Sequence, residues 1–514
     1  MHQQMNGSAS MEASGPDLPL VPAAVSIAES GGARTWRRAG SAADILGIFA
    51  KPLWAGVLVI VVALLQAIYN GTLPLYVDEA YYWMWSRHLA LSYFDHPPMI
   101  AWMIALATHF ASNEFTVRLV SVVCLSLSAW VLYRLARKLY DGRTAGIALL
   151  IFLAIPVVQM GYMLATPDAP QILFWTLALY ASHQAIFEEG KASYLATGVW
   201  IGLGLLSKYT AILFPASLLI FVLLRRPRIL ATWPAWAAMA VALLVFSPVL
   251  IWNAQHGWIS FSFQYNHGTS HDDTLHLGHF FEFLGGLFGV FSPVFFVLLL
   301  MALVTLFRRR PDDKSLFVAL FAVVPLLFFM YKGLYKKMEL NWVAMAFLAG
   351  TLIVADYVVR RRLYKTFWLG LGLAVLLDVA IKFPLALPLP PAWNIQHRLD
   401  GFREASMELL RYRQPGDALY GDYLTTASIL SFYAPGHPDA TVPTASRFSQ
   451  YDLWRKEGLA PSGPGLYLAT AHKGSELKAA CRTSRLLETY VYHFEDSGTK
   501  TFYLYRCDAK GAAT

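Results

Sequence analysis

The sequence of 514 residues is 56% hydrophobic and only 14% charged, with a mean hydropathy of +0.45. A soluble chain carries about 25% charged residues, so this composition excludes an ordinary soluble enzyme and indicates a membrane protein. The net charge of +8 comes from 41 Lys and Arg against 33 Asp and Glu. In a membrane protein such a surplus reflects basic cytoplasmic loops rather than nucleic-acid binding.

The chain begins with a polar segment and then turns apolar. Residues 1–44 are rich in Ala, Ser, Gly and Pro and lack the apolar core of a signal peptide, so we expect a disordered cytoplasmic tail. Residues 52–77 contain no charged side chain and are long enough to span a bilayer, which takes about 20 residues. Ten further apolar runs predict about eleven spans within residues 45–384: 115–135, 145–165, 170–187, 193–213, 213–224, 231–252, 280–307, 315–331, 340–358 and 366–384.

The charges of the loops predict the orientation of the spans. Four basic loops alternate with loops that are poor in Lys and Arg, and by the positive-inside rule the basic loops face the cytoplasm. The N-terminus is then cytoplasmic, and an odd number of spans places residues 385–514 in the periplasm of a bacterial inner membrane. The basic loops contain Arg134, Arg137, Lys138 and Arg143; Arg225, Arg226 and Arg228; Arg308, Arg309, Arg310 and Lys314; and Arg360, Arg361, Arg362 and Lys365.

Residues 385–514 have the pattern of a small soluble α/β domain. Helical periodicity occurs at 402–412 and 425–433, and alternating apolar residues predict strands at 418–420, 465–469, 487–494 and 501–506. The last two strands bring Cys481 and Cys507 near each other, and an oxidising compartment would permit a disulfide between them.

Six polar motifs lie at the outer ends of spans in this topology. Two of them share the first outer loop, and the other four follow the third, fifth, seventh and ninth spans. A charge rule that is independent of the motifs therefore brings all six to one side of the membrane. Their candidate site residues are Asp78, Glu79, Tyr81 and Tyr82; Asp95 and His96; Asp168; Lys208; His256; and Lys336, Lys337 and Asn341.

These residue types suit the transfer of a sugar from a lipid phosphate. A carboxylate can take the proton of the attacking hydroxyl, and cationic groups or a divalent metal can stabilise the charge on the leaving phosphate. Asp78, Glu79 and Asp95 are the candidate bases, and Asp95 with His96 is the candidate metal site. The candidate partners of the phosphate are Lys208, His256, Lys336 and Lys337.

Each candidate also has a structural interpretation. Acidic residues after a span often mark only the membrane boundary, and Tyr81 and Tyr82 are more typical of an interfacial aromatic belt than of a sugar-stacking platform. Lys208 could simply extend from a helix end toward water. The outer lysines Lys336 and Lys337 run against the positive-inside bias, which favours an anionic ligand. The irregularly spaced histidines of 253–279 favour a solvated loop over a metal site.

Together the motifs resemble the bacterial branch of the protein O-mannosyltransferase superfamily, which includes the aminoarabinose transferase of lipid A. The resemblance covers roughly residues 50–350. It implies a mainly α, polytopic GT-C glycosyltransferase fold, with helices along the membrane in the first outer loop and an outer catalytic cavity. It also implies a polyprenyl-phosphate sugar donor and inversion at the anomeric carbon.

The resemblance further implies roles for individual residues. The acidic residue after the first span is the expected catalytic residue, which corresponds to Asp78 with Glu79 beside it. The second acidic motif, Asp95-His96, is expected to position a divalent metal or the donor phosphate. The aminoarabinose transferase is expected to have Glu-Lys-Pro where this chain has Asp95-His96-Pro97, so the donor sugar and the use of a metal stay open.

We therefore predict an inverting glycosyltransferase that moves a sugar from a polyprenyl phosphate to lipid A, another glycolipid, a polysaccharide or a protein. The alternative is a transporter or flippase of lipid-linked sugars, but such proteins carry inverted repeats and polar residues at the bilayer midplane, and neither is clear in this sequence. No Walker motif is present, so we expect no nucleotide cofactor. The expected partners are the lipid-linked sugar, its acceptor and membrane lipids, and not nucleic acid.

Overall fold

The computed structural model describes residues 42–269, 274–384, 394, 396–443, 447–472, 474–495 and 498–509. The expected N-terminal tail lies outside these residues except for its last three, which begin helix α1 (Ala42–Phe49). The domain boundary expected at residue 384 follows helix α17 (Tyr364–Lys382). It stays a prediction, because residues 42–514 pack as one unit.

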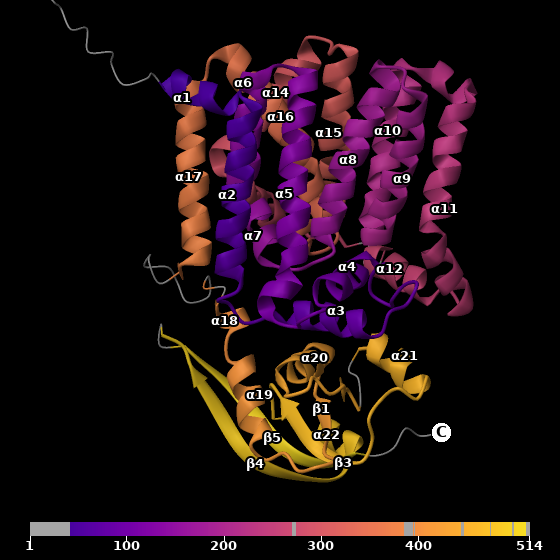
Figure 1. The fold of residues 1–514 in the computed structure, drawn as a ribbon, viewed down its shortest axis with the longest axis vertical. Helices are drawn as coiled ribbons and strands as arrows, with labels where there is room; N and C mark the ends of the chain where they lie inside the picture. The colour runs from indigo at the N-terminus through magenta and orange to yellow at the C-terminus, as the bar shows by residue number, and fades with distance from the viewer. Residues whose placement is uncertain are drawn as a thin grey trace, which may run out of the picture. The chain divides into compact units, whose positions relative to one another are not determined.

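Every predicted apolar run is helical (Figure 1). By length and composition, six helices in the described residues can cross a membrane, or up to eight if each bent pair counts as one span, so the predicted number of eleven is not confirmed. The helices of the runs are α2 (Pro52–Asn70), α5 (Glu114–Leu139), α6 (Gly142–Ala154) with α7 (Pro156–Met163), α8 (Asp168–Phe187), α9 (Lys191–Ser207), α10 (Leu213–Arg225), α11 (Trp233–Gln255), α13 (Leu277–Val290) with α14 (Pro293–Arg308), α15 (Asp313–Gly333), α16 (Ala344–Arg361) and α17.

Two of the predicted spans are broken rather than straight. The run 145–165 bends by 58° between α6 and α7, and the run 280–307 bends by 104° between α13 and α14. Each second helix begins with a proline, Pro156 or Pro293, whose ring removes a backbone donor and clashes with the preceding turn. Ser292, directly before Pro293, has a φ of 68°, which ends the first helix of that pair. The span predicted at 280–307 is therefore not a single continuous helix, and its count as one span stays a prediction.

Polar caps begin several of the helices at the loops between spans. The side chains of Asn113, Asp141 and Asp312 accept backbone N–H bonds from the third residue of α5, α6 and α15. Such caps satisfy donors that have no partner inside the helix. Short 3₁₀ helices η1 (Tyr209–Ile212), η2 (Pro227–Ala231) and η3 (Leu340–Val343) complete the connections.

The first outer loop forms two helices, α3 (Val77–Arg87) and α4 (Met99–Ala107). Figure 1 shows them with α12 (Ile259–Thr269) at one end of the spans, on the side where the C-terminal sheet lies. Helix α20 (Leu424–Tyr433) of the C-terminal part packs directly on α3. The helices that were expected to lie along the outer membrane surface are thus also the ones that contact the C-terminal part.

The C-terminal part contains a five-stranded sheet with the strand order β2-β1-β3-β5-β4. Strands β2, β1 and β3 are parallel, and β5 pairs antiparallel with β3 and β4. The predicted α/β character is confirmed, although β2, α18, α21 and α22 were not predicted. The strands are β1 (Ala418–Gly421), β2 (Ala440–Thr441), β3 (Pro464–Ala469), β4 (Cys481–His493) and β5 (Thr499–Ala509), and the helices are α18 (Gln396–Leu399), α19 (Phe402–Leu410), α20 (Leu424–Tyr433), α21 (Gln450–Lys456) and α22 (Gly474–Ala480).

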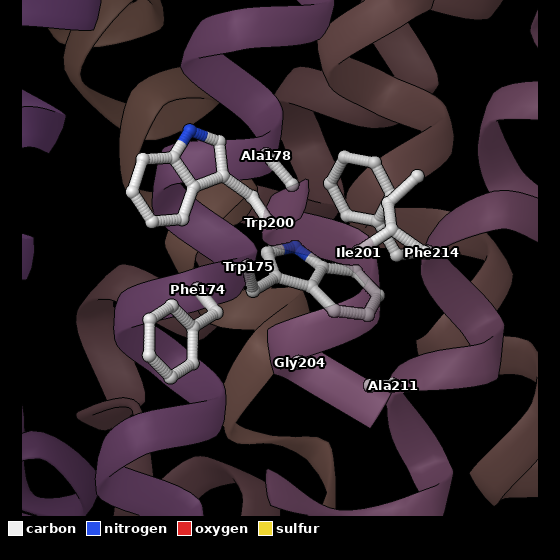
Figure 2. Close-up of a pocket in the computed structure, with 8 residues that line it drawn as sticks. All are labelled: Phe174, Trp175, Ala178, Trp200, Ile201, Gly204, Ala211 and Phe214. Atoms are coloured by element: carbon white, nitrogen blue, oxygen red, sulfur yellow. The ribbon is translucent and has the colours of Figure 1, made fainter. Parts of the chain in front are cut away.

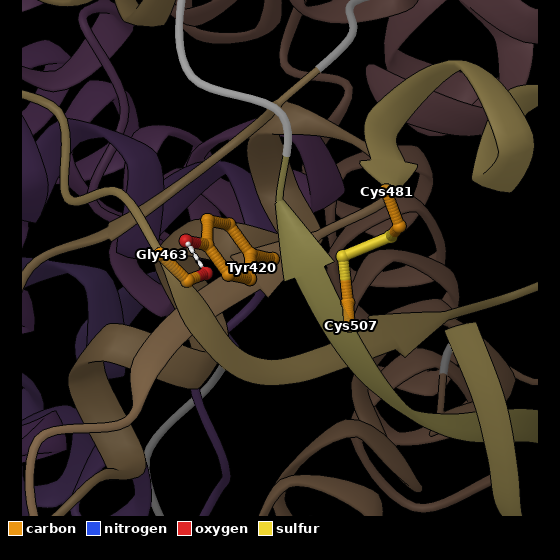
Figure 3. The surroundings of a disulfide bond; sticks show 4 residues. All are labelled: Tyr420, Gly463, Cys481 and Cys507. Atoms are coloured by element: carbon orange, nitrogen blue, oxygen red, sulfur yellow. Dashed lines mark hydrogen bonds between the residues drawn. A yellow bond between two sulfur atoms is a disulfide. The ribbon is translucent and has the colours of Figure 1, made fainter. Parts of the chain in front are cut away.

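A disulfide joins the two cysteines that the sequence pairs. Cys481 at the start of β4 is bonded to Cys507 near the end of β5 (Figure 3). In the same buried cluster as the two cysteines, the hydroxyl of Tyr420 donates to the carbonyl of Gly463 at 2.7 Å. Both links lie at the end of the sheet where β5 finishes.

Replacing both Cys481 and Cys507 by Ser is expected to destabilise the C-terminal part. The bond closes a loop with a sequence separation of 26 residues. A disulfide that closes a loop of this size stabilises the folded protein by about 3 kcal/mol, because it reduces the conformational entropy of the unfolded chain. Thermal unfolding of the purified protein in detergent should show a lower melting temperature. A reductant should lower the melting temperature of the wild type and leave that of the variant unchanged. Equal melting temperatures of wild type and variant would contradict the prediction.

Candidate active site

The two adjacent carboxylates of the first motif have different surroundings. Both lie in the first turn of α3, directly after the first span. The backbone N–H of Tyr76 donates to Glu79 Oε2 at 2.8 Å, which closes the N-terminus of the helix. Glu79 is completely buried, whereas Asp78 is partly exposed. The local structure therefore separates the roles of two residues that the sequence cannot distinguish.

Glu79 forms a buried ion pair with Arg118 of α5. Arg118 Nη2 lies 2.7 Å from Glu79 Oε2, Arg118 Nε lies 2.9 Å from Oε1, and the backbone N–H of Ala165 donates to Oε1 at 2.7 Å. Arg118 also donates to the carbonyls of Asn70, Leu73 and Pro74. All of the Glu79 oxygens are engaged by protein, so the geometry favours a structural role, and we carry Asp78 alone forward as the candidate base.

Asp78 forms neither a hydrogen bond nor an ion pair in the part of the chain that the structure describes. The pKa of its carboxyl is raised to about 6, mainly by burial and also by the nearby charges of Asp95 and Glu79, while Arg447 opposes the shift. A carboxylate with this pKa is ionised at neutral pH and is still basic enough to accept a proton. These are the properties of a general base.

Asp95 is held by two side chains. The hydroxyl of Tyr81 donates to Oδ2 at 2.8 Å, and the guanidinium of Arg447 pairs with Oδ1. Burial raises the pKa of the Asp95 carboxyl, and Arg447 opposes that shift. Tyr81 is itself buried and accepts the backbone N–H of Gln450 at 3.0 Å. Tyr81 therefore holds an acidic residue in place and is not part of an exposed aromatic belt.

Tyr82 lies where three of the motifs meet. Burial raises the pKa of its hydroxyl well above the ordinary value, and the charges of Asp78, Asp95 and Asp168 raise it further. Tyr82 is therefore within electrostatic range of all three carboxylates. The ring of His96 is 6.1 Å from the ring of Tyr82. The structure thus gathers motifs that are separated by up to 90 residues in the sequence.

A third cluster joins Asp168, Lys208 and Asn341. Lys208 Nζ lies 2.7 Å from Asp168 Oδ1, and Asn341 Nδ2 donates to Asp168 Oδ2 at 2.9 Å. The three residues come from the start of α8, the end of α9 and η3. The side chains of Lys208 and Asp168 are only 8% and 10% exposed, so Lys208 is buried in an ion pair and does not extend to water.

The remaining candidates contact residues outside these clusters. Lys337 pairs with the exposed Glu282 at 2.8 Å, and Lys336 Nζ lies 3.4 Å from the carbonyl of Asn266. His256 stacks on Trp252 with a centroid distance of 4.1 Å. In α17, the spacing of Asp378 and Lys382 in the sequence predicts an ion pair between them, but Lys382 donates to Gln159 of α7. Residues 270–273 of the loop that was predicted to be solvated lie outside the described residues.

The surroundings of Asp95 do not fit a metal ion. No three His, Cys, Asp or Glu side chains in the described residues lie close enough together to hold one. Both oxygens of Asp95 are already engaged, one of them by a cation. The metal stays a prediction of the sequence, and no step below depends on it.

Sequence reasoning missed two cations of the site. Arg118 is a completely buried charge inside a predicted span, and an ionisable residue in a span is a signal that we did not use. Arg447 precedes α21, whose N-terminus has the spacing of a capping box, with Asp452 Oδ2 accepting the N–H of Ser449 at 2.8 Å. That signal predicts the helix but not the contact of Arg447 with Asp95, since the two residues are 352 positions apart.

A small apolar hollow lies deeper among the spans (Figure 2). The carbonyl of Gly204, which lines it, accepts the N–H of Lys208, so the hollow begins one helical turn from the ion pair of Lys208. No ionisable group lines it, and it offers no chemistry of its own. Its lining residues are Phe174, Trp175, Ala178, Trp200, Ile201, Gly204, Ala211 and Phe214.

Comparison with known proteins relates the sequence to membrane glycosyltransferases. Residues 95–252 match the family described as dolichyl-phosphate-mannose-protein mannosyltransferase. The lipid A galacturonosyltransferase RgtD of Rhizobium johnstonii is 30% identical over 343 residues, which cover 65% of this chain and 72% of that protein. An undecaprenyl phosphate-alpha-4-amino-4-deoxy-L-arabinose arabinosyl transferase of Pseudomonas aeruginosa (strain LESB58) is 32% identical over 262 residues, which cover 48% of this chain and 47% of that protein.

A solved structure shares the fold. ArnT from Cupriavidus metallidurans, bound to undecaprenyl phosphate, superposes with a TM-score of 0.63 at 14% identity, and the match covers 87% of this chain and 97% of that one. At this identity the match shows the fold alone. It extends beyond the spans into the C-terminal part, for which the sequence provided no residue match.

Replacing Arg118 by Met is expected to destabilise the protein by about 3–5 kcal/mol, because it leaves the charge of Glu79 buried without a partner. Thermal unfolding in detergent measures the loss. The double variant Glu79→Gln/Arg118→Met should regain part of it, since no charge is then left unpaired. If Arg118→Met alone is as stable as the wild type, the ion pair does not have the structural role assigned to it.

Proposed function

This chain belongs to the GT-C glycosyltransferases of the dolichyl-phosphate-mannose-protein mannosyltransferase family, and from that premise we propose that its outer site transfers a sugar from a polyprenyl phosphate to an envelope lipid. The enzyme is a membrane-bound glycosyltransferase, and the relatives do not support the alternative of a flippase. It spans about half the length of the arabinosyl transferases that it matches. The identity of its substrates is therefore part of the proposal.

The names of the relatives supply the substrate class. The arabinosyl transferases are named for a sugar carried on undecaprenyl phosphate, and RgtD is named for lipid A. We infer a polyprenyl-phosphate donor and an acceptor of the lipid A type for this chain. Mass spectrometry of envelope lipids from a deletion strain would identify the molecule that loses a sugar.

The observation that carries the proposal is the charge pattern of the site. Three buried carboxylates of the site have a dedicated cation: Glu79 has Arg118, Asp95 has Arg447, and Asp168 has Lys208. Asp78 has none in the described residues. The exposed Glu339, whose charge also acts on Asp78, forms no ion pair in the described residues, but water can solvate it. A carboxylate that is neutralised by an ion pair is a poor base, so the pattern selects Asp78 for proton transfer.

Asp78 is proposed to take the proton of the attacking acceptor hydroxyl. As the acceptor oxygen bonds to the anomeric carbon, the bond from that carbon to the phosphate oxygen breaks, and the phosphate leaves with its lipid. Attack on the face opposite the phosphate inverts the anomeric carbon. Lys208 and Asn341, fixed by Asp168, are proposed to lie along the substrate, together with Tyr82 and His96. We propose that the substrate is also contacted by three residues outside the ion pairs of the site, Lys336, Lys337 and His256.

We also propose the topology that the loop charges predict. Residues 45–384 form the membrane domain, residues 385–514 form a periplasmic domain, and the N-terminus is cytoplasmic. The disulfide in the C-terminal part supports this orientation, because such bonds persist in oxidising compartments.

Asp78→Asn is expected to reduce sugar transfer by at least about 100-fold, the usual contribution of a general base. Because the amide keeps the shape of the side chain, membrane insertion and binding of undecaprenyl phosphate should be retained. Transfer is measured in vesicles that are supplied with a polyprenyl-phosphate sugar. Glu188→Gln, which removes an exposed carboxylate that pairs with Lys138 outside the site, serves as the control and should transfer normally. Normal transfer by Asp78→Asn would remove Asp78 as the base.

Cysteines placed at Lys336 and Lys337 are expected to react with a membrane-impermeant thiol reagent from the periplasmic side. A cysteine at Arg309 should react only after the inner face has been exposed. The native cysteines should contribute little labelling, since Cys124 is buried and the other two cysteines are bonded to each other. Labelling of the positions 336 and 337 from the cytoplasm would overturn the topology.

A further inference from the structure

Arg447 is the only member of the three ion pairs that comes from the C-terminal part. The segment from Arg447 to Tyr451 lies against the turn at residues 93–96. Gln450 Oε1 accepts the N–H of Phe94 at 3.0 Å, and the ring of Tyr451 stacks on Tyr81 at a centroid distance of 5.9 Å. Phe448 packs on Phe94 at 5.0 Å. These contacts fix the segment on both sides of Asp95, so the position of Arg447 is set by the fold.

The guanidinium of Arg447 is fixed but only partly covered. It pairs with Asp95 on one edge and lies over the ring of Phe263 at 5.1 Å. Its side chain is 40% exposed, whereas that of Lys208 is 8% exposed. An arginine presents five N–H donors; a single carboxylate uses at most two of them, and Tyr423 takes one more. Arg447 is therefore more accessible to a ligand than Lys208.

We propose that Arg447 binds the phosphate of the lipid carrier, so that the C-terminal part supplies one wall of the donor site. The inference rests on the proposed transferase function and specifies its donor site. The charge of Arg447 lowers the pKa of Asp78, yet the two form no ion pair, so neither group neutralises the other. An inverting transfer needs both a base and a partner for the leaving phosphate, and in this proposal Asp78 is the base and Arg447 is the partner. As the bond to the anomeric carbon breaks, the charge on the phosphate grows, and a fixed guanidinium stabilises it.

Asp95 has a defined part in this arrangement. It holds the guanidinium in one orientation and is held in turn by Tyr81. A preoriented arginine loses less side-chain entropy when it binds a phosphate. A guanidinium could bind the phosphate of the carrier lipid or that of a phosphorylated acceptor. The experiment therefore measures the binding of the carrier alone, without sugar or acceptor.

The test compares Arg447→Gln, Arg447→Lys and the control Lys456→Gln in the full-length protein, reconstituted in nanodiscs. Lys456 is an exposed cation at the end of helix α21, and its ammonium lies over the ring of Phe448. The dissociation constant of undecaprenyl phosphate is expected to rise at least about tenfold in Arg447→Gln, to rise less in Arg447→Lys, and to stay unchanged in Lys456→Gln. The kcat/KM of transfer should fall about 100-fold in Arg447→Gln, as for the loss of one donor that stabilises developing charge.

Two further outcomes decide between binding and a merely structural role. If Arg447 serves only to neutralise Asp95, the double variant Asp95→Asn/Arg447→Gln should recover transfer and carrier binding, and that recovery would overturn the proposal. Unchanged carrier binding by a folded Arg447→Gln would overturn it as well. If Arg447→Gln does not fold, Arg447→Lys decides by the same binding measurement. A failure of the proposed function gives a different result: the wild type then binds no carrier, or Asp78→Asn still transfers sugar.

Discussion

The buried pair of Glu79 and Arg118 is the interaction on which the rest of the site depends. It joins the start of α3 to α5, and through the carbonyls of Asn70, Leu73 and Pro74 it fixes the chain that connects the first span to α3. A charged pair without solvent is stable only if the remaining donors and acceptors are satisfied, and here each of them finds a backbone partner. Because Glu79 is immobilised, the preceding residue, Asp78, is held in a fixed position at the N-terminus of α3.

The other carboxylates follow the same principle of local neutralisation. Burying a charged carboxylate costs free energy that a nearby cation offsets, and Asp95 and Asp168 lie beside Arg447 and Lys208. The result is a region rich in charge, in which Asp78 differs from the buried Glu79, Asp95 and Asp168 in having no cation in the described residues. Burial and the remaining negative charges raise its pKa to about 6, which keeps it ionised and basic at neutral pH. The selectivity of the site thus comes from the pairing of charges, not from the number of acidic residues.

The sequence predicted which residues meet better than it predicted how they pair. The apolar runs and the loop charges placed six motifs on one side of the membrane, and the structure brings Asp78, Asp95 and Asp168 around Tyr82. Periodicity also predicted most of the C-terminal sheet. It did not predict the bend between α13 and α14, because a proline in an apolar run is compatible with both a kink and a break. The pairing of Asp95 with Arg447 was beyond reach for a different reason, since it depends on tertiary contacts between residues 352 positions apart.

The contact between Arg447 and Asp95 shows that the C-terminal part contributes to the arrangement of the site. An independent domain tethered outside the membrane would present its polar residues to water, but the segment beginning at Arg447 is bound to the first outer loop by an ion pair, a backbone hydrogen bond and aromatic stacking. Each contact involves a residue within or next to one of the acidic motifs. The acidic motifs therefore have their described arrangement only when the sheet and the spans are folded together. A site divided in this way is formed at the membrane surface, where a lipid-borne phosphate and the hydroxyl of its acceptor can both arrive.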